Sequence, residues 1–258
     1  MVKLPGSPDK KRMTLYAGGA ALAVILAGAA FLYFVVFPTS SPAPFKLASA
    51  GTGTGATSTA ASTSTTASST TAVTGTASSP AGKYSVGSGS KAGYRVREKL
   101  AFLPAESDAV GRTSQITGTA TVLQKGGSAT ISSASFNVAV NTLTSDRSMR
   151  DEKIHEIGLE SSRYPTATFV LSTPVTLPSS ISSGQVVRVT ATGVFNIHGV
   201  AKKETLPIEL VLSGGTLQAV GSLTFPWSEF GMTAPSVGGF VNVTEHATME
   251  FDLRLARA

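Results

Sequence analysis

The chain has 258 residues, a formal net charge of +6 at pH 7 and no cysteine. The lack of cysteine excludes disulfide scaffolds, thiolate metal sites and cysteine nucleophiles. Residues 1–82 hold five Lys or Arg and one Asp, a net of +4, whereas residues 83–258 hold 16 basic and 14 acidic residues, a net of +2. Because the basic residues of the larger part are not clustered as nucleic-acid binding requires, we expect no nucleic-acid partner.

A membrane anchor is predicted at residues 13–37, which carry no charge and are rich in Ala, Leu, Val and Phe. At about 1.5 Å per residue, such a helix exceeds the roughly 30 Å hydrocarbon core and can span it with some tilt. A cleaved signal peptide is the alternative, for which Ala48-Ser49-Ala50 offers small residues, but its apolar region usually has only about 7–15 residues. The basic flank at residues 1–12 predicts a cytoplasmic N-terminus, and hence a single-pass cell-membrane protein whose C-terminal domain is extracytoplasmic.

A flexible linker is predicted at residues 38–82, which are almost entirely Ser, Thr, Ala, Gly and Pro. The segment has too little apolar bulk to offset the entropy lost on ordering. As a Gly/Ser-like coil it would have a mean end-to-end distance on the order of 40 Å. The domain that follows would then be tethered but free to move, and the stalk would be open to O-glycosylation.

Residues 83–258 have the size and the patterning of a folded domain. Short stretches alternate between apolar and polar residues and end at Gly, Ser or Pro, which is typical of half-buried strands. We predict eight strands, at Gly93–Leu100, Ala109–Leu123, Ser128–Val140, Ala167–Ser172, Val186–Ile197, Lys202–Leu212, Gly215–Phe225 and Val241–Leu255. One apolar face and one polar face indicate an all-β antiparallel barrel or sandwich, and eight strands suit a closed barrel.

The clearest of these patterns is a hairpin over residues 186–212. Its two arms alternate strictly, and the turn between them contains His198-Gly199, where glycine is the residue best able to take a positive φ. Two strands alone are marginally stable in water. The apolar face of this hairpin must therefore be covered by more sheet, by a helix or by a bound apolar molecule.

A short crossover helix is predicted after the third strand, within residues 148–165. Ser148 and Asp151 have the spacing of a loose capping box, Ile154 and Ile157 share one face, and Gly158 is a candidate stop. The charges of this segment are those of a solvated helix face. Alternatively, Arg150 and Lys153 form a charged rim that meets a polar head group at the mouth of a barrel.

No catalytic residue, metal site or cofactor is predicted. The three histidines lie in different elements without H-x-x-x-H spacing, and for His198 we favour a structural hydrogen bond to the backbone over a ligand contact. The chain has no G-x-S-x-G motif and no evident carboxylate pair for acid–base chemistry. These absences favour a binding protein over an enzyme.

The inward-facing aromatic residues suggest either a packed core or a cavity. An eight-stranded barrel is about the size at which side chains fill the interior or leave room for one small ligand. Small inward residues, Ala167, Ala191 and Gly193, favour some room, although Gly193 also suits a bulge or a bend.

Five motifs, in this order, carry a resemblance to a known family. They are Arg150-Asp151, Arg163-Tyr164-Pro165-Thr166-Ala167-Thr168-Phe169, Gly193 to Gly199 (GVFNIHG) with Lys202-Lys203, Trp227-Ser228-Glu229-Phe230-Gly231, and Val243-Thr244-Glu245-His246 continuing to Leu253. With them, residues 84–258 resemble the YceI-like family. The chain departs from its pattern at Lys153, where a histidine is expected, and at Leu159, where an aromatic residue is expected.

The resemblance implies a lipocalin-like eight-stranded antiparallel barrel that holds a polyisoprenoid chain, such as an isoprenyl phosphate or a quinone tail. The residues expected to line the ligand site are Phe136, Val138, Phe169, Phe195, Ile197, Ile208, Leu210, Phe230 and Phe251. Two other classes remain open: a structural or adhesive module with a packed core, and a lipid-modifying enzyme. The sequence leaves the oligomeric state open.

Overall fold

The computed structural model describes residues 41–47, 79–100, 106–237 and 241–258. The predicted membrane span at 13–37 and most of the predicted linker lie outside these residues. Within the described part of the chain, no helix is both long enough and apolar enough to cross a bilayer. Residues 43–258 form one compact unit, to which all elements named below belong.

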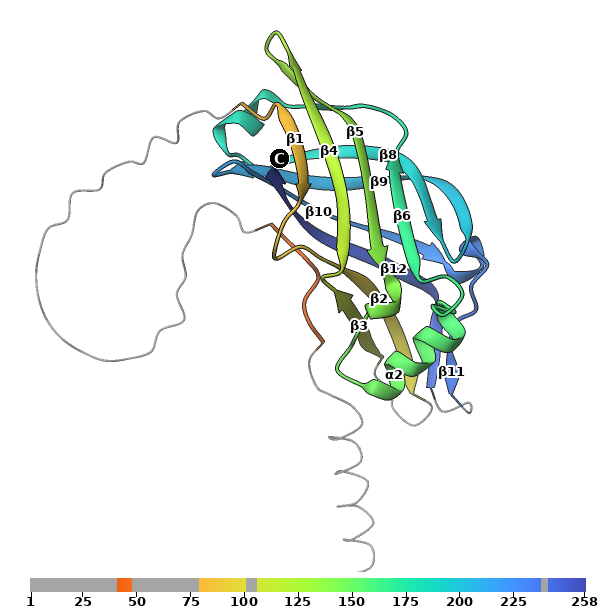
Figure 1. The fold of residues 1–258 in the computed structure, drawn as a ribbon. Coiled ribbons are helices and arrows are strands. Elements are labelled where there is room, and N and C mark those ends of the chain that lie inside the picture. Colours follow the sequence, from red (N-terminus) through yellow and green to blue (C-terminus); the bar gives the residue numbers. More distant parts are fainter. Residues whose placement is uncertain (1–40, 48–78, 101–105, 238–240) are drawn as a thin grey trace, which may run out of the picture. The chain divides into compact units, whose positions relative to one another are not determined.

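The unit is built from one antiparallel sheet of twelve strands (Figure 1). The strands are β1 (Gly82–Val86), β2 (Lys91–Leu100), β3 (Ser107–Thr113), β4 (Ile116–Lys125), β5 (Ser128–Ala139), β6 (Thr166–Leu171), β7 (Val175–Leu177), β8 (Val187–Ile197), β9 (Val200–Ser213), β10 (Thr216–Pro226), β11 (Ser236–Val237) and β12 (Val241–Arg257).

Eight of these strands close into a barrel, in the order β1, β4, β5, β6, β8, β9, β10 and β12. Closure depends on β1, which pairs with β4 on one side and with the C-terminal end of β12 on the other, where Tyr84 lies opposite Arg257. The N-terminal part of β12 pairs instead with β2, so the β2–β3 hairpin extends the wall beyond the ring. The predicted eight-stranded antiparallel barrel is therefore confirmed.

The membership of the barrel differs from the prediction in two places. The single strand predicted at Ala109–Leu123 is two strands, β3 and β4, separated by a tight turn at Ser114-Gln115 in which the Gln115 N–H donates to Thr113 Oγ1 at 3.0 Å. This turn contains neither Gly nor Pro, so the alternating pattern runs through it without a visible break. The ring is closed by β1, which was not predicted, and β2, predicted as Gly93–Leu100, lies outside the ring.

The β8–β9 hairpin turns at His198-Gly199, as predicted, and β9 begins at Val200, two residues before the predicted start. Ile197 lies opposite Val200, and the two residues between them, His198 and Gly199, have φ values of 54° and 75°. Two consecutive positive φ values are typical of a type I′ turn, whose twist matches that of the flanking strands. The prediction that Gly199 takes a positive φ is confirmed.

The short helix is present, but its predicted cap is wrong. Helix α2 (Ser148–Lys153) continues as a π-helical turn, η2 (Ile154–Gly158). Arg147, not Ser148, occupies the N-cap position, and no side chain caps the helix. Asp151 instead accepts a hydrogen bond from the Ser145 N–H at 2.8 Å and so ties down the loop before the helix. The helical segment ends at Gly158, as predicted.

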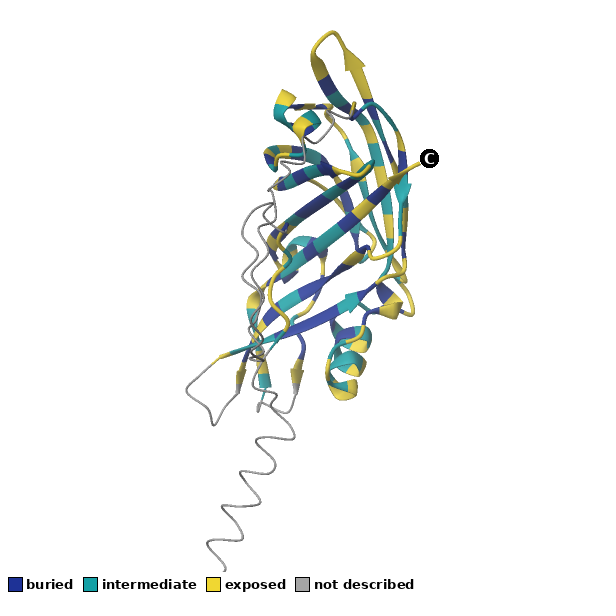
Figure 2. Ribbon diagram, turned by 90° about the vertical axis from the view of Figure 1, so that its left-hand side faces the viewer, coloured by how far each residue is buried: buried dark blue, intermediate teal, exposed yellow. Residues whose placement is uncertain are grey.

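The hydrophobic core lies inside the barrel. Along β8 and β9, buried residues alternate with exposed or half-buried ones. Figure 2 shows buried residues interspersed with exposed and half-buried ones along the strands of the barrel. The inward residues include Phe195, Ile197, Leu206 and Leu210, each at most 5% exposed. The other face of the same strands is polar, because successive side chains of a strand point to opposite sides of the sheet.

Candidate ligand-binding cavity

The interior of the barrel is incompletely filled and contains an apolar cavity of about 170 Å³. Its lining comes from β2, β4 to β10 and β12, together with residues of the α2–η2 segment and of the η4 turn (Trp227–Phe230). No lining residue carries a charge, and hydroxyl groups occur only on Tyr94, Thr168 and Thr248. Such a cavity favours a hydrocarbon and disfavours a charged group that would lose its hydration.

Eight of the nine side chains expected to bind a ligand line this cavity: Phe136, Val138, Phe169, Phe195, Ile197, Ile208, Leu210 and Phe251. The ninth, Phe230, does not belong to the lining. It is completely buried and packs edge-on against Phe225, with the ring centroids 4.8 Å apart. Phe230 is therefore placed to support the wall of the barrel, not to contact a ligand.

The phenylalanines of three neighbouring strands form a row along the wall. The ring centroid of Phe169 on β6 lies 4.7 Å from that of Phe195 on β8 and 6.5 Å from that of Phe136 on β5. Ala167 and Ala191, expected from the sequence to leave room, also line the cavity. The row presents a continuous aromatic surface to the lumen.

Glycines opposite the aromatic residues keep the cavity open. Gly118, Gly221 and Gly111 are the cross-strand partners of Phe136, Phe251 and Tyr94. A Cβ added at these glycines would lie only 2.5, 2.6 and 2.3 Å from the respective rings. Each ring therefore occupies the space above a glycine.

Gly193 serves Phe169 in the same way, since a Cβ there would lie 2.1 Å from the ring. The β6–β8 and β8–β9 registers run through Gly193 without a bulge, so this glycine makes space for a ring and does not mark a bulge. Rings that lie over the wall leave the middle of the barrel free. The sequence suggested room at Gly193, but it did not show the pairing of Gly111, Gly118 and Gly221 with aromatic rings, because that pairing depends on the register between strands.

Arg150, one of the two predicted rim residues, is held by carboxylates. Its Nε and Nη2 donate to the two carboxylate oxygens of Glu98 at 3.0 and 3.1 Å, and Nη1 donates to Asp146. Burial lowers its pKa and the pairing with Glu98 raises it, with a net rise above the ordinary value. Glu98 lies on the inner face of β2, in phase with Ala92, Tyr94 and Val96, so this ion pair fastens α2 to the end of β2 (Figure 1).

Lys153, the second predicted rim residue, lies on the outer side of α2. Its Nζ donates to Glu156 Oε2 at 2.9 Å, and this hydrogen bond raises its pKa above the ordinary value. Neither Lys153 nor Arg150 lines the cavity. Lys153 therefore fits the interpretation as part of a solvated helix face, whereas Arg150 belongs to a partly buried ion pair.

Tyr94 on β2 is a cavity residue that sequence reasoning missed. Its hydroxyl is buried without a hydrogen-bond partner, and burial raises its pKa, with a further rise from the nearby carboxylate of Asp151. The positive charge of the nearby Arg150 guanidinium offsets part of this rise in the pKa of Tyr94. The sequence signal that could have identified Tyr94 was its position on the same, inward face of β2 as Ala92 and Val96.

Two of the three histidines, His155 and His198, contact other side chains of the fold. The ring nitrogens of His155 lie 2.8 Å from Ser161 Oγ and 2.9 Å from the Leu143 carbonyl oxygen. His198 does not make the expected hydrogen bond to the backbone. Its ring centroid lies 4.3 Å from that of Tyr164. Its Nε2 lies 3.3 Å from Glu160 Oε1 but without hydrogen-bond geometry. In the residues that the structure describes, no group of three His, Asp or Glu side chains could hold a metal ion.

Comparison with known proteins assigns the family. The YceI-like domain model matches residues 55–255, which is most of the chain and the whole barrel up to Leu255. No curated protein matches.

Several solved structures are similar at low identity. A polyisoprenoid binding domain from Saccharophagus degradans, implicated in plant cell wall breakdown, is 12% identical with a TM-score of 0.49, covering 69% of this chain and 99% of its own. Burkholderia cenocepacia BcnA is 22% identical with a TM-score of 0.46, covering 64% of this chain and 96% of its own. A Campylobacter jejuni YceI protein is 16% identical with a TM-score of 0.42, covering 60% of this chain and 90% of its own. The assignment rests on the family model alone: the chain belongs to the YceI-like domain family.

Proposed function

We propose that the barrel binds one long apolar lipid, a polyisoprenoid such as an isoprenyl phosphate or a quinone tail, in its interior. The observation that carries this proposal is a closed barrel with a charge-free cavity, kept open by glycines opposite its aromatic residues. The resemblance to the YceI-like family implies the same ligand class. The protein is proposed to act as a non-enzymatic carrier or sequestering domain, held at the outer face of a membrane by the predicted span at residues 13–37.

Binding of a long chain requires the cavity to expand. An engineered apolar cavity of about 150 Å³ holds a benzene molecule, so about 170 Å³ accepts only part of a prenyl chain without movement of the wall. Buried apolar surface contributes about 25 cal/mol per Å², which allows micromolar or tighter binding after the costs of ordering. The partly buried rings of Phe136, Phe169 and Phe251 are the side chains best placed to move.

Lipid extraction followed by mass spectrometry of the purified chain tests the proposal. We expect a prenyl lipid in the extract, or saturable uptake of a prenyl phosphate or a quinone by protein that has been stripped of lipid. An empty protein that takes up neither of these, nor a fatty acid, would show that the interior is a packed core. The structural or adhesive alternative would then replace the carrier.

Gly221→Ala is expected to weaken lipid uptake while the fold is kept. The new Cβ would lie 2.6 Å from Phe251 Cζ, and its close neighbours are side-chain atoms, so the ring can move into the lumen and narrow the cavity. Losing one or two buried methylene contacts of the ligand, at about 0.8 kcal/mol each, corresponds to roughly a four- to fifteen-fold weaker Kd. Fluorescence titration with a prenyl lipid measures the change.

Gly127→Ala is the matched control, because no atom lies within 4 Å of a Cβ at that position and its φ is not in the left-handed region. The control should bind as the unchanged protein does. Equal affinity of the Gly221→Ala protein and the control would contradict the role assigned to the glycine–aromatic pairs.

A further inference from the structure

A short segment before the barrel, residues 43–47, lies on the outside of its wall. Arg112 on β3 donates from Nη2 to the Ala43 carbonyl oxygen at 2.6 Å, and its guanidinium carbon lies 3.9 Å from the centroid of the Phe45 ring. Leu47 is only 7% exposed. We call residues 43–47 the strap.

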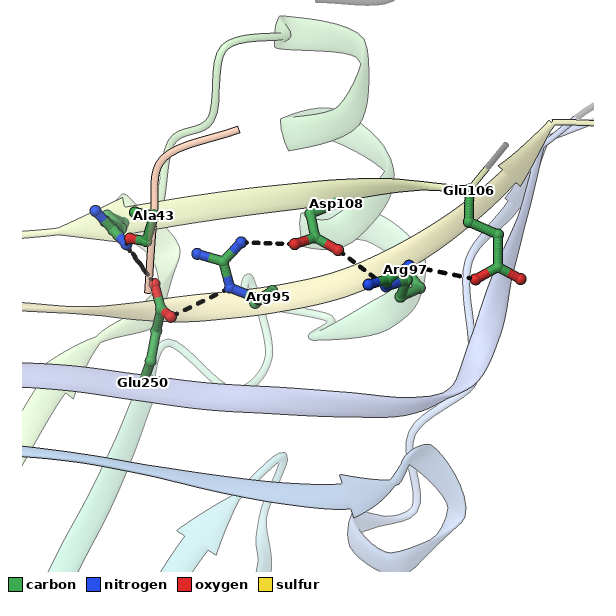
Figure 3. Close-up of polar contacts among 7 residues, drawn as sticks. Ala43, Arg95, Arg97, Glu106, Asp108 and Glu250 are labelled. Atoms are coloured by element: carbon green, nitrogen blue, oxygen red, sulfur yellow. Dashed lines mark hydrogen bonds and ion pairs between the residues drawn. The ribbon is translucent and has the colours of Figure 1, made fainter. Parts of the chain in front are cut away.

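The surface beneath the strap is a network of paired charges across β12, β2 and β3 (Figure 3). Glu250 accepts from Arg112 Nη2 and Nε at 2.6 and 3.0 Å and from Arg95 Nε at 3.4 Å, while only 3% of its side chain is exposed. Arg95 also pairs with Asp108 at 2.9 Å. These pairs hold the Arg112 guanidinium in the orientation that meets both the Ala43 carbonyl and the Phe45 ring, so the docking surface is organised in advance.

The chain is fixed to the barrel a second time just before β1. The Ser79 carbonyl accepts from Arg257 Nη2 at 2.6 Å, and the Pro80 carbonyl accepts from the Tyr84 hydroxyl at 2.7 Å. Residues 48–78 therefore connect two points of the same barrel. With the strap in place, they add no length between the predicted span and the barrel.

We propose that the strap sets how far the barrel reaches from the membrane. This inference rests on the proposed anchor at residues 13–37. With the strap docked, the tether is residues 38–42, which extend over at most about 17 Å at about 3.4 Å per residue. With the strap released, the whole predicted linker, residues 38–82, would form the tether, with a mean length on the order of 40 Å and a contour of about 150 Å if it behaves as the flexible coil expected from its composition.

The docked strap therefore holds the lipid-binding barrel at the bilayer surface, and release of the strap lets the barrel move away from that surface. The occupant of the Arg112 surface is a segment of the same chain, so its effective concentration is high even though few groups make contact. Among the contacts described above, release breaks those of Arg112 with Ala43 and Phe45 and exposes Phe45 and Leu47. Both states are thus accessible to one chain without unfolding the barrel.

Electron spin resonance on the full chain tests the docking directly. The protein has no cysteine, so Lys46→Cys in the strap and Lys125→Cys at the end of β4, both exposed, give a unique label pair. We expect one narrow distance distribution, which Phe45→Ala broadens several-fold, because it removes the ring that stacks on Arg112. Pro44→Ala, at an exposed neighbouring position, is the control and should keep the distribution narrow.

Arg112→Lys provides a second variant that keeps a positive charge beside Glu250 but loses the planar guanidinium. It should also broaden the distribution and lower the melting temperature, because Glu250 loses the guanidinium, whereas Phe45→Ala and Pro44→Ala should melt as the unchanged protein does. A broad distribution in the unchanged strap, or a narrow one in Phe45→Ala, would overturn the docking.

Energy transfer in lipid nanodiscs tests the consequence for reach. A donor at Lys125→Cys and acceptors on the lipid head groups should give efficient transfer, which falls in Phe45→Ala and not in Pro44→Ala. If spin labels show release in Phe45→Ala but transfer does not change, the strap is real and the proposed control of reach is wrong. If transfer is absent in all variants, the proposed anchor fails, and the inference on reach fails with it.

Discussion

Phe195→Arg is expected to abolish lipid uptake by the barrel. Phe195 is 4% exposed, lines the cavity and packs against Phe169, so a guanidinium at this position would be desolvated in the apolar lumen without a partner. An unpaired charge in such a site costs several kcal/mol, and removal of the ring adds a further loss of about 3–5 kcal/mol. Titration with a prenyl lipid, together with a thermal melt followed by circular dichroism, measures both effects.

Val194→Arg is the matched control for this substitution. Val194 is the neighbouring residue on β8, is 37% exposed and faces outward, so the same side chain is added to the other face of the strand. We expect uptake and melting temperature close to those of the unchanged protein. Undiminished uptake by a folded Phe195→Arg protein would contradict a ligand site in the lumen, and if that variant does not fold, Gly221→Ala decides the question.

Gly199→Val is expected to lower the melting temperature by roughly 2–12 °C. Valine in the left-handed region costs about 1–3 kcal/mol, and each kcal/mol corresponds to roughly 2–4 °C in a domain of this size. The new Cβ would also lie 2.6 Å from Tyr164 Cε1, so the ring that packs on His198 must move. A differential scanning calorimetry trace measures the shift.

Gly214→Val separates the two causes, because Gly214 in the β9–β10 turn also has a positive φ, 57°, but no atom lies within 4 Å of its Cβ position. This control reports the cost of the backbone conformation alone. The additional loss in Gly199→Val is then due to Tyr164. Equal shifts in the two variants would show that Tyr164 accommodates the side chain freely.

The elements that the sequence determined are those whose signal is local. The alternation over Val187–Ile197 and Val200–Ser213 depends on a period of two residues within one strand, and the His198-Gly199 turn depends on two adjacent positions. The inward phases of Phe136, Phe169, Phe195 and Phe251 follow from the same period. The predicted span, the linker and the extracytoplasmic location also come from local composition, and they remain predictions.

What only the tertiary structure decided depends on partners that are distant in the chain. β1 closes the barrel because it meets both β4 and β12, and Gly221 accommodates Phe251 because the β10–β12 register places them opposite each other. Arg150 pairs with Glu98 across 52 positions, which converts an expected rim charge into a fastening of α2. Pairings of this kind depend on strand register and on helix placement, which are set by packing of the whole barrel and leave no periodic trace in the sequence.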